Sequence, residues 1–186
     1  MTAALHCNVS RPEADLDVRF ITDCNLGTLA KWLRILGYDT LYERGNADPD
    51  FLRKAATVGR IVLTRKRELA RLSSAGHLVV VKADHVRGQL GEVLEALSLE
   101  PDPVKKMTRC LRCNTLLEKI PKERVEGCVP AYVYVKCIQF KGCPSCGGIY
   151  WPGTHRRHIE ESLRVRIPQR HGFRIGLALN LIQGPE

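Results

Sequence analysis

Four cysteines occur as two Cys-x-x-Cys pairs, Cys110–Cys113 and Cys143–Cys146. Two intervening residues let both sulfurs of a pair face one ion, and two pairs supply the tetrahedral thiolate set that Zn²⁺ prefers. A redox pair is the alternative for one such motif, but two pairs about thirty residues apart favour a zinc ribbon. Four thiolates leave no position for water, so the spacing predicts a structural zinc site. The gap exceeds the commonest ribbon spacing, which leaves Cys137, and more weakly Cys128, open as substitute ligands.

Acidic side chains follow the short apolar runs that predict strands. Asp23 comes directly after the run 18–22, Asp84 follows the run 78–81, and Asp48 opens a predicted helix. Ligands of open parallel sheets bind outside the carboxyl ends of the strands, where we expect these carboxylates to converge. Crowded carboxylates repel one another unless a divalent cation lies between them. The pattern therefore predicts a Mg²⁺ or Mn²⁺ site that activates water for phosphoryl chemistry.

Two of these acids also have a purely structural interpretation. Asp48 followed by Pro49 is a favourable N-cap and first-turn pair. Asp84 before His85 can equally cap the helix that follows. Asp23 is harder to explain in this way, because an acid directly after a buried strand stands where a site is expected.

The elements that position these residues follow from the hydrophobic periodicity. Short apolar runs predict strands at 18–22, 38–42, 61–63 and 78–81. Helical spacing and stop signals predict helices at 26–36, 49–58 and 65–73 and a fourth that carries Leu90, Val93, Leu94 and Leu97. Strands alternating with helices call for an α/β fold, a parallel sheet flanked by helices. Beyond a linker at 101–103, the runs 133–135 and 149–151 predict hairpin strands of a small β-rich ribbon.

The chain has 186 residues, of which 44% are hydrophobic and 26% charged, and this excludes a disordered or fibrous protein. The predicted organisation is an N-terminal tail at 1–17, an α/β domain at 18–100, a zinc ribbon at 105–154 and a basic C-terminal segment at 155–186. A formal net charge of +9 indicates a polyanionic partner, nucleic acid before an anionic membrane surface. No apolar run approaches the roughly 20 residues that cross a bilayer, and the start does not resemble a signal peptide, so we expect a cytoplasmic protein.

Basic residues gather around both candidate sites. A solvated charged surface is the plain interpretation, but aromatic residues among them favour RNA, whose unpaired bases stack on aromatic rings. These aromatic residues are Tyr132, Tyr134, Tyr150 and Trp151. The expected RNA-binding residues are Lys31, Arg34, Arg65, Lys66, Arg67, Arg109, Arg112, Arg156 and Arg157. Lys31 and Arg34 are expected on the side of the first helix that faces away from its apolar stripe.

Four stretches combine into a specific set of motifs. They are FITDCNLGTLAKWLRILG at 20–37, VLTRKREL at 62–69, RCLRCN at 109–114 and CPSCGGIYWPGTH at 143–155. Over residues 18–158 the chain resembles the Mut7-C RNase family. This resemblance implies a PIN-like nuclease domain followed by a four-cysteine zinc ribbon, RNA as the substrate, and acids that hold Mg²⁺ or Mn²⁺ for phosphodiester hydrolysis. Asp23, Asp48 and Asp84 match the family's acids.

Lys66 departs from the family pattern, which usually has an aspartate at the end of the third strand. One unit-charge interaction at ~4 Å is worth about 4 kcal/mol at an effective dielectric constant near 20, so reversing its sign is a large perturbation. Glu68, one helical turn away, is a poor substitute. Two hypotheses follow. The chain is a metal-dependent endoribonuclease that uses Asp23, Asp48 and Asp84, or it is a catalytically degenerate protein that binds RNA or docks on a ribonucleoprotein.

Overall fold

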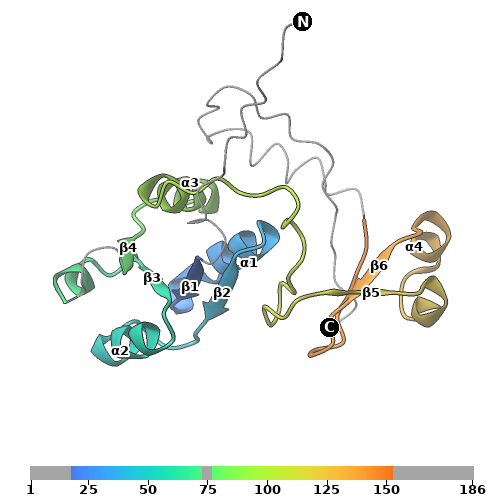
Figure 1. The fold of residues 1–186 in the computed structure, drawn as a ribbon, viewed down its shortest axis with the longest axis horizontal. Helices are drawn as coiled ribbons and strands as arrows, with labels where there is room; N and C mark the ends of the chain where they lie inside the picture. Colours follow the sequence, from blue (N-terminus) through green and yellow to red (C-terminus); the bar gives the residue numbers. More distant parts are fainter. Residues whose placement is uncertain (1–17, 73–76, 153–186) are drawn as a thin grey trace, which may run out of the picture.

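The structure is a computed structural model that describes residues 18–72 and 77–152. Its centre is a parallel sheet in the order β2-β1-β3-β4 (Figure 1). The strands are β1 (Arg19–Thr22), β2 (Asp39–Tyr42), β3 (Ile61–Thr64) and β4 (Leu78–Val80). Three α-helices cover this sheet, namely α1 (Gly27–Ile35), α2 (Pro49–Thr57) and α3 (Val86–Ala96). The predicted fold class, a parallel sheet flanked by helices and followed by a small cysteine ribbon, is confirmed.

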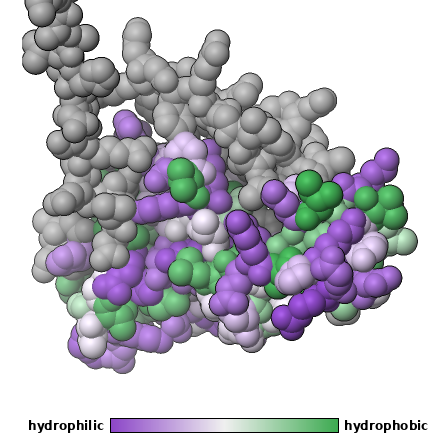
Figure 2. All heavy atoms as spheres, turned by 45° about the vertical axis from the view of Figure 1, so that its right-hand side comes forward, coloured by the Kyte–Doolittle hydropathy of each residue, from purple (hydrophilic) through white to green (hydrophobic). Residues whose placement is uncertain are grey.

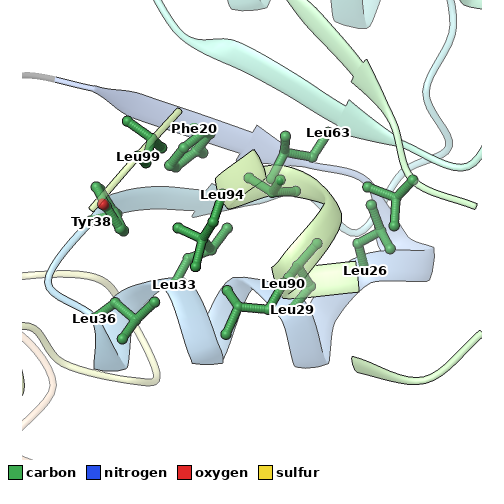
Figure 3. Packing of buried hydrophobic residues seen from close by; sticks show 12 residues of the cluster. Phe20, Leu26, Leu29, Leu33, Leu36, Tyr38, Leu63, Leu90, Leu94 and Leu99 are labelled. Carbon is green, nitrogen blue, oxygen red and sulfur yellow. The ribbon is translucent and has the colours of Figure 1, made fainter. Parts of the chain in front are cut away.

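Successive residues of the central strands point to opposite faces and bury two separate apolar layers. Phe20 of β1 and Leu63 of β3 pack against the leucines of α1 and α3. Figure 3 shows these leucines pointing toward one another and toward the sheet. Ile21 and Val62, one position along, pack instead against Phe51 of α2. Because both faces are covered, the strands read as continuous apolar runs and their carboxyl ends are left as the open edge.

The third predicted helix is shorter than expected. The segment expected as a helix at 65–73 is a 3-10 turn, η3 (Arg67–Arg71). Lys66 before it has extended backbone, and Leu69 is the one residue of the turn that is buried. A single apolar anchor does not stabilise several helical turns, because most helical stability in proteins comes from a packed apolar face.

The ribbon is an antiparallel sheet of β5 (Glu118–Ile120), β6 (Phe140–Gly142) and β7 (Ile149–Tyr150). The predicted strand at 149–151 corresponds to β7, but the predicted strand at 133–135 is wrong. That segment lies in helix α4 (Ala131–Lys136), which follows the 3-10 turn η4 (Lys122–Val125). Val133 packs into an apolar cluster while its neighbours stay more exposed. In so short a segment, one buried residue fits a helix and a strand equally well.

Several expectations fall outside the described residues. The tail at 1–17 and the basic segment at 155–186, with Arg156 and Arg157, are among them. The domain boundaries themselves stay predictions. Within 18–72 and 77–152, no helix combines the length and the apolar character that spanning a membrane requires.

Candidate functional site

The four predicted zinc ligands meet in one cluster. Their sulfurs all lie within 4.8 Å of one another, and Cys110 and Cys143 are buried. The Sγ atoms of Cys110 and Cys146 are 3.5 Å apart, and those of Cys113 and Cys143 are 3.4 Å apart. Tetrahedral Zn–S bonds of about 2.3 Å place sulfurs roughly 3.8 Å apart. This donor set fits Zn²⁺, which would fold the ribbon as a structural ion without taking part in chemistry.

Each pair of cysteines is followed by a turn in which one residue must adopt the left-handed backbone conformation. Asn114 has φ +71° and donates its N–H to the Cys110 carbonyl at 2.9 Å. Gly147 has φ +68° and donates to the Cys143 carbonyl at 3.0 Å. Asparagine and glycine are the residues that adopt this backbone conformation most readily.

The thiols differ in acidity before a metal binds. Burial raises the pKa of Cys113, but hydrogen bonds with Thr115 and with neighbouring cysteines outweigh this effect, and the pKa falls to about 6. Burial raises the pKa of Cys146 to about 12. Zinc binding must therefore release protons from some of the ligands.

The two alternative ligands lie outside the cluster. Cys137 donates its S–H to the carbonyl of Pro152 at 3.2 Å, and Cys128 is exposed. The sequence reasoning placed Tyr150 among the base-stacking residues and missed its position beside a zinc ligand, where it is 3% exposed. Its hydroxyl accepts the Leu111 N–H at 3.2 Å and lies 2.9 Å from the sulfur of Cys110, so it can donate to the thiolate. Only its position two residues after a Gly-Gly pair hinted at such proximity.

Asp23 lies at the carboxyl end of β1 as predicted, but its carboxylate is held within the protein. The side chain is completely buried. Oδ2 accepts the hydroxyl of Thr64 at 2.7 Å, and Oδ1 accepts the N–H of Asn25 at 2.9 Å as the N-cap of η2 (Cys24–Leu26). Asp23 therefore joins the ends of β1 and β3 and starts the turn that leads into α1.

The other two acids have separate partners. Asp48 is exposed and caps α2 by accepting the Phe51 N–H at 2.7 Å. Asp84 is exposed and pairs with Arg65 at 2.7 Å, and this hydrogen bond and the arginine's charge lower the pKa of the Asp84 carboxyl. Asp84 does not cap α3, whose N-cap is His85.

Lys66 reaches across the rim of the sheet that the carboxyl ends of β1 and β3 form. Its Nζ donates to the carbonyl of Ala47 at 2.8 Å, directly before Asp48. Among the described residues, the cysteines form the one group of three or more ligand side chains that could hold a metal, and the three aspartates form none. A Mg²⁺ or Mn²⁺ ion needs several oxygens converging on it, and the three aspartates are each bonded to other groups in this structure, so the predicted Mg²⁺ or Mn²⁺ site stays a prediction.

The predicted RNA-binding residues divide into two groups. Lys31, Arg67 and Arg112 are exposed, as is Arg65 beside Asp84. Seen from the ribbon side, the described surface is largely hydrophilic, with separate apolar spots (Figure 2).

The second group of basic residues and half of the aromatic candidates are not free to meet RNA. The expected exposure of Arg34 is wrong, because this side chain is 4% exposed. It donates to the carbonyls of Leu111 and Arg112, which lie in the first zinc knuckle, Cys110–Cys113. Arg109 is partly buried and bonded to the carbonyls of Gly37 and Asn114. Tyr150 and Trp151 are buried as well, so they cannot stack on bases.

The other two aromatic candidates lie on α4. Tyr132 is 72% exposed, so its ring is open to a base. The Nζ of Lys122 lies over the ring of Tyr134, 4.9 Å from the centroid of that ring. Of the four predicted stacking residues, Tyr132 is therefore the one whose ring is both exposed and uncovered by that cation.

Comparison with known protein families gives one match. The model of the Mut7-C RNase domain covers residues 18–163 and confirms the resemblance carried by the motifs. Searches of curated proteins and of solved structures returned no match.

Proposed function

We propose that this chain, which belongs to the Mut7-C RNase domain family, binds RNA on its exposed cations and does not cleave it by a metal-dependent route. The observation that carries this proposal is the contact of the Lys66 ammonium with the carbonyl of Ala47 at 2.8 Å. A cation that belongs to the chain thus lies at the rim where the family pattern has a carboxylate.

The neighbouring charges support the same conclusion. Arg65 neutralises Asp84 at 2.7 Å, so one further carboxylate of the rim is paired within the protein. The side chain of Arg67 is exposed and adds a positive charge to the surface of the rim. A surface of this kind attracts phosphates by charge and releases counterions when it binds them. In this proposal the protein recognises the phosphate backbone of the RNA. Its partner is then RNA or a ribonucleoprotein on which it docks.

A second candidate function is supported by the family match itself. In this alternative, the chain is a metal-dependent endoribonuclease whose Asp23, Asp48 and Asp84 bind Mg²⁺ or Mn²⁺ once RNA is present. Asp23 supports it, because this buried carboxylate stands at the carboxyl end of the sheet, where ligands of such folds bind. It requires that Asp84 leave Arg65.

The experiment that separates the two functions is a binding and cleavage assay on end-labelled single-stranded and hairpin RNAs with Mg²⁺, Mn²⁺ or EDTA. We compare the wild-type chain with Lys66→Asp, and use Arg67→Asp as the matched control, because it makes the same charge change at an exposed neighbour. The proposal expects salt-sensitive binding without products for the wild type and for the Arg67→Asp control, whereas Lys66→Asp is the one variant of the three that can restore cutting. Metal-dependent products from the wild type that disappear in a folded Asp23→Asn variant would overturn it.

A further inference from the structure

The first zinc knuckle is held from outside by a buried arginine of the parallel-sheet domain. Arg34 lies on α1 and is 4% exposed. Its Nη1 donates to the carbonyls of Leu111 at 2.7 Å and Arg112 at 3.2 Å, the two residues between the first pair of cysteines. Its Nε donates to the carbonyl of Thr40 at 2.9 Å. Burying a guanidinium without acceptors is strongly unfavourable, so Arg34 depends on the knuckle to supply them.

The knuckle in turn reaches back to the sheet through Asn114. This side chain is 6% exposed. Its Oδ1 accepts the N–H of Thr40 at 3.0 Å, and its Nδ2 donates to the carboxylate of Asp39 at 2.8 Å. β2 is an edge strand, so these contacts satisfy an N–H that has no neighbouring strand to bond. The zinc knuckle thus takes the place of a further strand at that point.

The chain that leads into the knuckle is packed against the end of α1. The N–H of Met107 donates to the carbonyl of Ile35 at 2.9 Å, and the Nε of Arg109 donates to the carbonyl of Gly37 at 3.1 Å. A Cβ on Gly37 would lie 2.3 Å from the carbonyl oxygen of Lys105. Only glycine allows this approach, so the segment before the knuckle lies directly against the sheet domain.

We infer that zinc binding and the seating of the ribbon on the sheet form one coupled equilibrium, with Arg34 and Asn114 as positioning residues for the zinc site. The hydrogen bonds of Arg34 to Leu111 and Arg112, and those of Asn114 to β2, form only when the knuckle is folded and seated on the sheet. Coupling of this kind is reciprocal, so a metal that orders the knuckle also stabilises the sheet domain. Residues that orient metal ligands without binding the ion typically change metal affinity by 10–100-fold. This inference does not depend on whether the chain cleaves RNA.

Trp32 offers a direct readout of the seating. It packs against both the core of the sheet domain and the apolar cluster around the cysteines. The chain has two tryptophans, and the other is Trp151. In a full-length Trp151→Phe background, the tryptophan emission therefore comes from Trp32 alone, and it changes when the ribbon moves away from the sheet domain.

The test measures two quantities in that background, the zinc affinity by competition with a chromophoric chelator and the Trp32 emission as zinc is withdrawn. Asn114→Gly removes the amide and keeps the left-handed backbone, and Arg34→Met removes the guanidinium. Lys31→Met is the control, because it removes an exposed cation from the same helix. We expect both test variants to weaken zinc binding by about 10–100-fold, the control to match the parent, and zinc withdrawal to shift the Trp32 emission.

Two results would overturn the inference. One is a folded Asn114→Gly variant with the parent's zinc affinity. The other is Trp32 emission that does not change when zinc leaves the parent protein. If Arg34→Met fails to fold, the Asn114→Gly variant and the emission of the parent still decide the question.

Discussion

Removing the hydroxyl of Thr64 is expected to destabilise the protein, because this hydroxyl connects three segments at the carboxyl end of the sheet. Thr64 Oγ1 donates to Asp23 Oδ2 at 2.7 Å and accepts the N–H of Lys66 at 3.1 Å. Thr64 and Asp23 are both completely buried. Thr64→Val therefore leaves a buried carboxylate oxygen and a backbone N–H without these partners. One buried unsatisfied group costs about 1–3 kcal/mol, and more when charged, so we expect a loss of about 2–4 kcal/mol in the free energy of unfolding.

Urea and thermal unfolding measure this loss. At about 3 °C per kcal/mol for a chain of this size, the midpoint of thermal unfolding should fall by about 6–12 °C. Thr57→Val is the control, because Thr57 is exposed and its hydroxyl bonds only within α2. A midpoint for Thr64→Val equal to that of the control would refute a structural role for the Asp23–Thr64 contact. The result also decides how Asp23→Asn is interpreted. Asp23 accepts one hydrogen bond on each oxygen, and asparagine has a single acceptor oxygen, so a loss of cleavage must be separated from a loss of stability.

Three further outcomes are expected. Arg112→Ala and Lys31→Ala each remove an exposed cation. Each should reduce the steepness of log RNA affinity against log salt concentration by about 0.7 for every phosphate that is no longer neutralised. An unchanged slope would exclude that residue from the RNA surface. Tyr150→Phe removes the hydroxyl 2.9 Å from a zinc-ligand sulfur and should speed zinc transfer to a chelator several-fold; equal rates would contradict that role. Burial raises the pKa of Asp39, but hydrogen bonds from Arg60 and Asn114 outweigh this effect and hold the pKa of the carboxyl below its ordinary value. The stability that the Asp39 carboxylate contributes is present above its ordinary pKa and is lost as the pH falls through the lowered pKa. Unfolding of Asp39→Asn, followed by circular dichroism, should therefore depend less on acid below about pH 4 than unfolding of the wild type. Identical acid titrations of the two proteins would argue against this contribution of Asp39.

The sheet could be predicted from the sequence because its signals are redundant. The strand at 18–22 carries the adjacent apolar residues Phe20 and Ile21, and the helix at 49–58 has both a cap and a glycine stop. Both elements occur, as β1 and α2. Periodicity fails where one contact decides the structure. Val133 is the single buried residue of α4, and Leu69 that of η3, so neither segment had enough turns to show its period.

The zinc ligands were predictable and the rim was not, because the two sites depend on different information. Each Cys-x-x-Cys pair fixes the local geometry of its own two sulfurs, and the preference of Zn²⁺ for four thiolates predicted that the two pairs meet, as they do. The acids come from separate elements, and each finds its partner through tertiary contacts that spacing does not encode, such as Arg65 for Asp84. Arg34 shows the same limit, since its place on α1 becomes buried only when the ribbon covers it.

The charges at the rim explain how a chain of this family can do without a divalent ion under the proposed function. Carboxylates that face one another need a cation between them, and an ion from solution supplies it in a metal-dependent enzyme. In this chain the cations are covalently attached, since Arg65 meets Asp84 and the Lys66 ammonium is anchored on the carbonyl of Ala47. Asp23, which is hydrogen-bonded to Thr64, serves to join two strands. Under this proposal, a rim whose carboxylates are paired with the chain's own cations needs no metal ion to offset their charge and still presents positive charge to a phosphate backbone, which favours retained RNA binding over retained cleavage.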